Sequence, residues 1–219
     1  MKRVGVILAG CGVNDGSEIH EAVLTLLALD RAGAQAVCLA PDLPQAQVWD
    51  HLAAAKSGES RNVLVESARI ARGRIRRLSE VRGDELDAVV IPGGFGSVLN
   101  LSDFGSQGAA CRVDAGVERL LRELLDQGKP IGALCIAPGT LARVLQGAGR
   151  SARLTIGHDA ETAGILEQLG QKHVDCAAGQ AVVDEQNRIV TSPAYMLARS
   201  IGEVADSAEA LVREVLRLA

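Results

Sequence analysis

The chain has 219 residues, 47% hydrophobic and 23% charged, which suits a single soluble domain over residues 1–219 with a large buried core. A net charge of -4 and an aromatic content of 2% exclude the basic, base-stacking surface typical of nucleic-acid-binding proteins. No apolar run reaches the roughly 20 residues that span a membrane, so we expect no membrane partner and a cytoplasmic location.

Short and almost wholly apolar runs predict the strands of a sheet that is covered on both faces. The predicted strands are residues 4–9, 35–40, 87–91, 131–134, 153–156, 174–176, 181–183 and 189–192. A polar turn at 184–188 joins the last two and predicts a β-hairpin near the C-terminus.

Segments with apolar residues at helical spacing alternate with these strands. The predicted helices are residues 18–32, 48–55, 63–71, 113–126, 140–145, 159–169 and 194–218, and a surface loop is predicted at 100–110. The alternation predicts an α/β fold with a doubly wound, mostly parallel sheet and helices on both faces.

A glycine-rich turn at 10–16 follows the first strand, where a dinucleotide-binding fingerprint would lie. Its spacing is G-x-G-x-x-x-G, and three acids, Asp15, Glu18 and Glu21, occupy the place of a pyrophosphate. Acids at a helix N-terminus suit the helix dipole but repel phosphate. A nucleotide-binding oxidoreductase is therefore the weakest of the functional hypotheses.

Cys135 ends the strand 131–134 and is followed by Ala137, Pro138 and a predicted helix. A cysteine in such a strand-to-helix corner receives backbone N–H groups and the positive end of the helix dipole, both of which favour the thiolate. The alternative is a buried structural cysteine. The five cysteines show no C-x-x-C pair, and neither a disulfide framework nor a zinc site is expected.

Four segments together resemble the DJ-1/PfpI superfamily, which has a flavodoxin-like fold related to class I glutamine amidotransferases. They are residues 7–21, the turn Pro92–Gly96, Cys135–Pro138 and Thr191–Met196. The resemblance covers essentially the whole chain. It is nearest to the ElbB-type isoprenoid biosynthesis glyoxalases.

The resemblance implies roles for individual residues. Cys135 matches the nucleophile, and Glu18 matches a buried glutamate that hydrogen-bonds the cysteine and moves protons. The backbone N–H groups of Gly94, Gly93 and Ile136 match the groups that hold an oxyanion. A protonated glutamate can donate to a thiolate, which supports pairing an acid with this cysteine.

The sequence also departs from related branches. Glutamine amidotransferases need a late histidine and acid, and the peptidase-like branch has a histidine directly after the cysteine, where this chain has Ile136. Neither chemistry is expected here. Weaker candidates for a place in the site are His158, Asp15, Asn100, His20 and Tyr195.

The function that the resemblance implies is a cofactor-independent glyoxalase acting on a small dicarbonyl such as glyoxal or methylglyoxal. The alternatives are a protein deglycase and a redox-sensing or chaperone protein that uses an oxidisable Cys135. No metal and no other cofactor are expected. A homodimer is expected by analogy with the superfamily.

Overall fold

The computed structural model describes residues 1–219 and confirms the mostly parallel sheet. The sheet has seven strands in the order β10-β11-β7-β6-β1-β2-β5, and only β10 runs antiparallel to its neighbour. The strands are β1 Arg3–Ile7, β2 Gln35–Ala40, β5 Ile75–Arg77, β6 Ala88–Ile91, β7 Ile131–Leu134, β10 Val182–Asp184 and β11 Ile189–Ser192.

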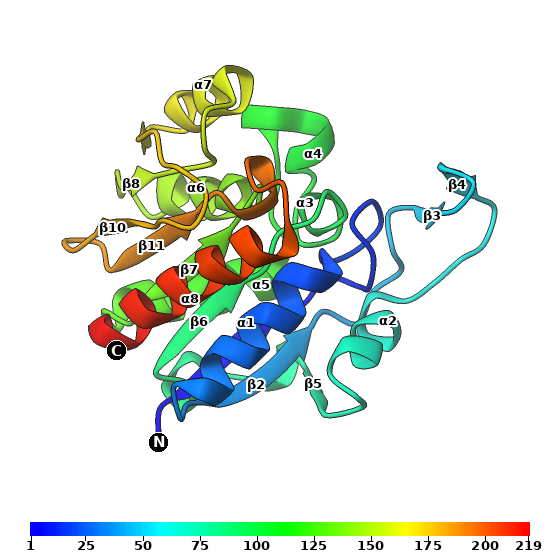
Figure 1. Ribbon diagram of the computed structural model, residues 1–219, viewed down its shortest axis with the longest axis horizontal. Helices are drawn as coiled ribbons and strands as arrows, with labels where there is room; N and C mark the ends of the chain where they lie inside the picture. The colour runs from blue at the N-terminus through cyan, green and yellow to red at the C-terminus, as the bar shows by residue number, and fades with distance from the viewer.

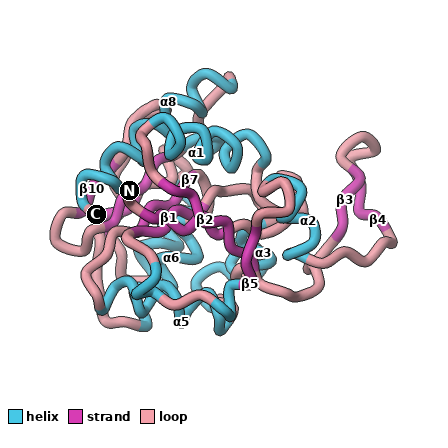
Figure 2. The backbone as a smooth tube through the Cα atoms, turned by 90° about the horizontal axis from the view of Figure 1, so that it is seen from below, coloured by secondary structure: helices cyan, strands magenta, loops and turns pink.

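Helices cover both faces of this sheet, as the sequence predicted (Figure 1). Helices α1 (Ile19–Arg31), α2 (Val63–Ile70) and α8 (Ile201–Leu218) pack on one face. Helices α5 (Ala115–Asp126) and α6 (Pro138–Gly147) pack on the other, so each face has its own apolar core. Figure 2 shows the two layers on opposite sides of the strands.

The centre of the sheet positions the candidate site. Strands β7, β6 and β1 are adjacent and parallel, so their carboxyl ends lie at the same edge. The chain leaves this edge through Cys135 after β7, Gly93 after β6 and the glycine-rich turn after β1. In an open α/β sheet this edge is where ligands bind.

The predicted helix at 48–55 is wrong. These residues form an arm, a hairpin of β3 (Val48–Asp50) and β4 (Ala55–Ser57) that stands clear of the body in Figures 1 and 2. The N–H of Trp49 donates to Asp15 Oδ2 at 2.9 Å, and Ala54 turns the chain with a φ of +51°. The periodicity of a short apolar run does not distinguish a strand from a helix. Here the hydrogen bond from Trp49 to Asp15 on the glycine-rich turn favours the extended conformation.

The C-terminal segment differs from the predicted helix 194–218. A short 3-10 turn, η4 (Ala194–Met196), follows β11, and α8 begins only at Ile201, where Ser200 Oγ accepts the N–H of Glu203 at 3.2 Å. Serine is a strong N-cap because its side chain satisfies an unpaired N–H of the first turn. The interruption places Tyr195 in this short turn directly after β11 instead of within the long helix α8.

Other departures are smaller. The predicted loop 100–110 contains one-turn helices, and the predicted strand at 174–176 is displaced to β9, which pairs with β8. Strand β5 was not predicted, because it is three residues long and two of them are arginines.

The remaining elements are α3 Ser97–Asn100, α4 Phe104–Gln107, η1 Leu78–Glu80, η2 Gly83–Glu85, η3 Gly108–Ala110, α7 Ala160–Gln168, β8 Arg153–Leu154 and β9 Lys172–His173. None of the helices is both long and apolar enough to cross a membrane.

Candidate active site

Cys135 lies at a strained strand-to-helix corner. It is the first residue after β7, its φ is +57°, and its N–H donates to the carbonyl of Ser192 at 2.9 Å. Helix α6 begins three residues later with Pro138 in its first turn. A left-handed φ is uncommon for a residue with a side chain and is held here by the surrounding strands. Cys135 is only 7% exposed.

The carboxyl group beside Cys135 belongs to Glu21. This residue lies in the first turn of α1, is fully buried, and hydrogen-bonds the Cys135 side chain. Its Oε2 accepts the N–H of Gly93 at 2.8 Å, and its Oε1 accepts the N–H of Tyr195 at 3.2 Å. Two backbone N–H groups, from the segments after β6 and β11, therefore hold one carboxyl beside the sulfur.

The expectation that Glu18 is the buried partner of the cysteine is wrong. Glu18 is the half-buried N-cap of α1, with extended backbone, and its Oε2 accepts the N–H of Glu21 at 2.8 Å. The helix starts only after Glu18, so the side chain of Glu18 caps the first turn, while Glu21 faces the sheet. The helical spacing of the sequence could have identified Glu21, because it shares the buried face of α1 with Ala22, Thr25 and Leu29.

The three backbone groups that the resemblance suggested for an oxyanion site have different surroundings. The N–H groups of Gly94 and Ile136 donate toward the Cys135 sulfur. The N–H of Gly93 is instead bound by Glu21. The prediction that the N–H of Gly93 binds an oxyanion is therefore wrong, because Glu21 accepts that N–H. Gly93 instead leaves room between Cys135 and Glu21. A Cβ at Gly93 would lie 2.4 Å from the Cβ of Cys135 and 2.6 Å from Glu21 Oε2, so only glycine allows the two side chains to meet.

Burial raises the pKa of the Glu21 carboxyl from 4.5 to about 7, although the N–H groups of Tyr195 and Gly93 oppose the rise. Burial also raises the pKa of the Cys135 thiol well above its usual range, and the charge of Glu21 raises it further, against the N–H groups of Gly94 and Ile136. The expected lowering of the thiol pKa is therefore not met. A proton on Glu21 removes the charge that adds to the rise, whereas burial of the sulfur still raises the pKa.

A second pair of polar side chains lies beside this one. His20 Nδ1 and the Tyr195 hydroxyl are 2.7 Å apart, and the two rings are tilted by 43°. Burial, followed by the charges of Glu18 and Glu21, raises the pKa of Tyr195. The structure thus brings two of the weaker sequence candidates together next to Glu21.

Asp15 and Asn100 brace the glycine-rich turn and do not face Cys135. The amide of Asn100 donates to the carbonyls of Ala9 at 2.8 Å and Asp15 at 2.9 Å, and its Oδ1 accepts the N–H of Ala46 at 2.8 Å. Asp15 is 3% exposed and is bonded to the N–H of Trp49 through Oδ2. Neither residue therefore keeps the site role that we expected for it.

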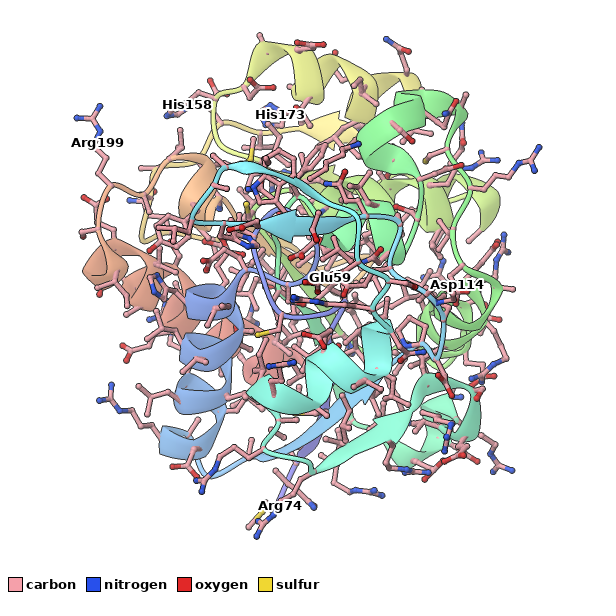
Figure 3. All side chains as sticks on the ribbon, turned by 90° about the vertical axis from the view of Figure 1, so that its right-hand side faces the viewer. Glu59, Arg74, Asp114, His158, His173 and Arg199 are labelled. Atoms are coloured by element: carbon pink, nitrogen blue, oxygen red, sulfur yellow. The ribbon has the colours of Figure 1, made fainter.

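His158 also has other surroundings than expected. Its imidazole is exposed, and Nδ1 lies 3.7 Å from Asp175 Oδ1, which lies 3.8 Å from Nδ1 of His173 (Figure 3). The histidine thus belongs to a surface cluster. No group of histidine, cysteine and acidic side chains in the chain is arranged to hold a metal ion.

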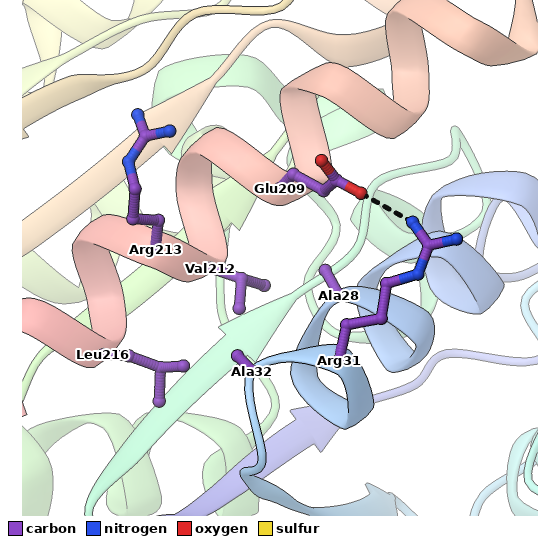
Figure 4. Close-up of a pocket in the computed structure, with 7 residues that line it drawn as sticks. All are labelled: Ala28, Arg31, Ala32, Glu209, Val212, Arg213 and Leu216. Atoms are coloured by element: carbon purple, nitrogen blue, oxygen red, sulfur yellow. Dashed lines mark hydrogen bonds and ion pairs between the residues drawn. The ribbon is translucent and has the colours of Figure 1, made fainter.

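Several hollows of the surface lie away from Cys135. One of about 440 Å³ opens between α1 and α8, with Ala28, Val212 and Leu216 on its walls and an ion pair of 2.9 Å between Arg31 and Glu209 at its rim (Figure 4). It lies about two turns along α1 from Glu21, so it does not serve the cysteine.

The chain is similar to several known proteins. The model of the DJ-1/PfpI family matches residues 6–202. The chain is 46% identical to glutamine amidotransferase-like class 1 domain-containing protein 3, mitochondrial, from Homo sapiens, over 99% of this chain and 83% of the relative. It is 44% identical to ES1 protein homolog, mitochondrial, from Rattus norvegicus, over 99% and 84%.

Solved structures show the same fold. An isoprenoid biosynthesis protein with an amidotransferase-like domain from Ehrlichia chaffeensis superposes with a TM-score of 0.92 at 38% identity, covering 99% of this chain and 100% of that one. DJ-1beta of Drosophila melanogaster has a TM-score of 0.52 at 23% identity, covering 100% and 95%, and supports the fold alone.

Proposed function

Because the chain belongs to the DJ-1/PfpI family, a family that includes enzymes, we propose that it is a cofactor-independent glyoxalase built on Cys135 and Glu21. The observation that carries the proposal is the buried hydrogen bond between a thiol at a strained corner and a carboxyl whose pKa is raised to about 7. A carboxyl with a pKa near the working pH can both give and take a proton.

The reaction begins when the Cys135 proton passes to Glu21 and the sulfur attacks the aldehyde carbon of glyoxal or methylglyoxal. A C–S bond forms, and the carbonyl π electrons move to oxygen. The N–H groups of Gly94 and Ile136, which donate toward the sulfur, stabilise this oxyanion. Glu21 then returns its proton to the oxygen and gives a neutral hemithioacetal.

Glu21, now ionised, removes the proton from the former aldehyde carbon and delivers it to the neighbouring carbon through an enediolate, while the hydroxyl proton of the hemithioacetal moves to the second oxygen and the first oxygen becomes the thioester carbonyl. The product is a 2-hydroxy thioester on Cys135, in which one carbon has been oxidised and the next reduced. Water attacks the thioester, the C–S bond breaks, and glycolate or lactate leaves. The overall change is the addition of one water to the dicarbonyl, with no external oxidant or reductant.

Access favours a small substrate. Cys135 is 7% exposed and Glu21 is fully buried, so the reacting atoms are within reach of a two- or three-carbon molecule. A protein-bound sugar adduct, which a deglycase must process, is larger and would have to reach the same buried atoms.

Two further expectations stay predictions. The mammalian relatives are named mitochondrial, so the cytoplasmic location expected from the sequence remains to be tested. The homodimer is likewise an expectation from the family resemblance.

The experiment that tests the proposal is turnover of methylglyoxal to lactate by the purified chain and by Cys135→Ser and Cys11→Ser. Cys11 is a half-buried thiol on the glycine-rich turn and serves as the matched control. We expect Cys135→Ser to lose at least about 1000-fold in kcat/KM, in line with removal of a nucleophile, and Cys11→Ser to remain within about threefold. Lactate formation by Cys135→Ser at the wild-type rate would end the proposal.

A further inference from the structure

The pair formed by His20 and Tyr195 has no role in the chemistry described above. His20 lies in the first turn of α1, one residue before Glu21, and Tyr195 lies in η4 after β11. The two residues are 175 positions apart in sequence, and their polar atoms are 2.7 Å apart. They link the two segments that hold the Glu21 carboxyl.

Tyr195 is tied to the reacting groups through its backbone. Its N–H donates to Glu21 Oε1 at 3.2 Å, and its ring packs against the apolar cluster that contains Cys135. The residue before it, Ala194, is fully buried and has a φ of +40°. This left-handed conformation is costly for alanine and fixes the direction in which Tyr195 leaves the turn.

The hydroxyl of Tyr195 faces acidic surroundings. Glu18 and Glu21 are the charges that act on it, and together with burial they raise its pKa, so the phenol keeps its proton. When His20 carries hydrogen on Nδ1, it donates to the phenol oxygen, and the phenol O–H is then free to donate elsewhere. Tyr195 is half-buried, and its N–H bond to Glu21 Oε1 at 3.2 Å places its side chain beside the residues that hold the reacting pair.

We propose that Tyr195 recognises the second oxygen of a 1,2-dicarbonyl bound at Cys135, and that His20 positions the phenol for this contact. The inference rests on the proposed function for the identity of the substrate. It assigns specificity to Tyr195: the pair favours molecules that carry an oxygen on the carbon next to the one attacked. His20 is a positioning residue, because it acts through the phenol.

The test is protection of Cys135 from iodoacetamide, followed by mass measurement of the Cys135 peptide. Methylglyoxal is compared with propanal, a molecule of similar size that lacks the second oxygen. Both add reversibly to a thiol, so each has a half-protective concentration. In Tyr195→Phe we expect this concentration to rise about tenfold for methylglyoxal, as for loss of one hydrogen bond, and less than twofold for propanal.

Substitution of His20 separates positioning from packing. His20→Leu should reproduce the effect of Tyr195→Phe, the double variant should add nothing further, and His20→Asn, which keeps a donor near the position of Nδ1, should restore most of the wild-type protection. His158→Leu, which alters an exposed histidine paired with Asp175, is the control.

An equal rise in the half-protective concentrations of methylglyoxal and propanal in Tyr195→Phe would overturn the inference. A hydrogen bond between Tyr195 and His20 that only supports the fold would affect the binding of both molecules alike. No change for either molecule would also overturn it. The assay does not require turnover. A chain that binds methylglyoxal through Tyr195 but releases no lactate would reject the proposed glyoxalase and retain this inference.

Discussion

Cys135 and Glu21 act as one titrating unit at the scale of single residues. Burial raises the pKa of both groups, and the charge of Glu21 raises that of Cys135 further, whereas the hydrogen bond with Cys135 lowers that of Glu21. The glycine at 93 is what permits the contact, and the Glu18 carboxyl supports it by capping the helix that carries Glu21. The sequence alone indicated an acid and a cysteine at this edge, and the helical turn decided which acid.

Substitution of Glu18 should affect stability more than chemistry. Glu18→Ala removes the side chain that accepts the N–H of Glu21 and should lower the free energy of unfolding by about 1 kcal/mol. Turnover should stay within about threefold of wild type. Chemical denaturation and lactate formation check both statements, and a loss of turnover as large as that of Glu21→Gln would assign the proton transfer to Glu18 instead.

Gly93→Ala should disrupt the site. The added Cβ would lie 2.4 Å from the Cβ of Cys135, so either the corner or the helix has to shift. We expect a loss of at least about 100-fold in turnover, since small misplacements of reacting groups carry such costs. Gly58→Ala, at a position open to solvent, is the control. Full activity in Gly93→Ala would contradict the close contact between Cys135 and Glu21.

At the scale of elements, the arm formed by β3 and β4 is attached to the glycine-rich turn. Asp15 accepts the N–H of Trp49, and the side chain of Gln47 donates to the carbonyl of Asn14 at 2.7 Å. Most of the tip is exposed, with Leu52 at 99%. Because a two-stranded hairpin has little stability of its own, these contacts at its base hold the arm in place.

Trp49 is the single tryptophan of the chain and reports directly on this attachment. Asp15→Ala removes the acceptor of its N–H, so we expect the arm to detach, tryptophan emission to move to longer wavelength, and amide exchange across residues 48–57 to accelerate at least about tenfold. Glu59→Gln, which alters an exposed acid next to the arm, should change neither. An unaltered emission spectrum in Asp15→Ala would show that other contacts hold the arm.

The central elements could be predicted from sequence because their apolar runs are dictated by burial. Residues 35–40, 131–134 and 189–192 are strands with the bounds that their composition indicated. The arm, β5 and the interruption before α8 could not be predicted, because each depends on a partner distant in sequence or on a turn conformation such as that of Ala194. The Cys135 corner was predictable, whereas the contact between His20 and Tyr195 required the fold.

At the scale of the whole molecule, the buried Glu21 carboxyl makes stability depend on pH. Its folded pKa of about 7 lies above the ordinary value of 4.5, so between these values the folded state holds a proton that the unfolded state releases. The contribution to stability is full below pH 4.5 and is lost as pH rises through about 7.

Glu21→Gln should therefore become progressively more stable relative to wild type across this interval. The expected change in the difference is up to about 3 kcal/mol, since one pKa unit corresponds to about 1.4 kcal/mol. Denaturant unfolding at pH 5 and pH 8 measures it. Glu18→Gln, treated in the same way, is the control. A difference between Glu21→Gln and wild type that is the same at both pH values would show that Glu21 titrates alike in the folded and unfolded chain.

The pairing of Glu21 with Cys135 is tested most directly by the pH dependence of Cys135 alkylation in wild type, Glu21→Gln and Glu18→Gln. Loss of the Glu21 charge should lower the pKa of the thiol, so the alkylation profile of Glu21→Gln is predicted to move to lower pH while turnover is lost. The profile of Glu18→Gln is predicted to follow wild type. A profile that Glu21→Gln leaves in place and Glu18→Gln moves would contradict the pairing.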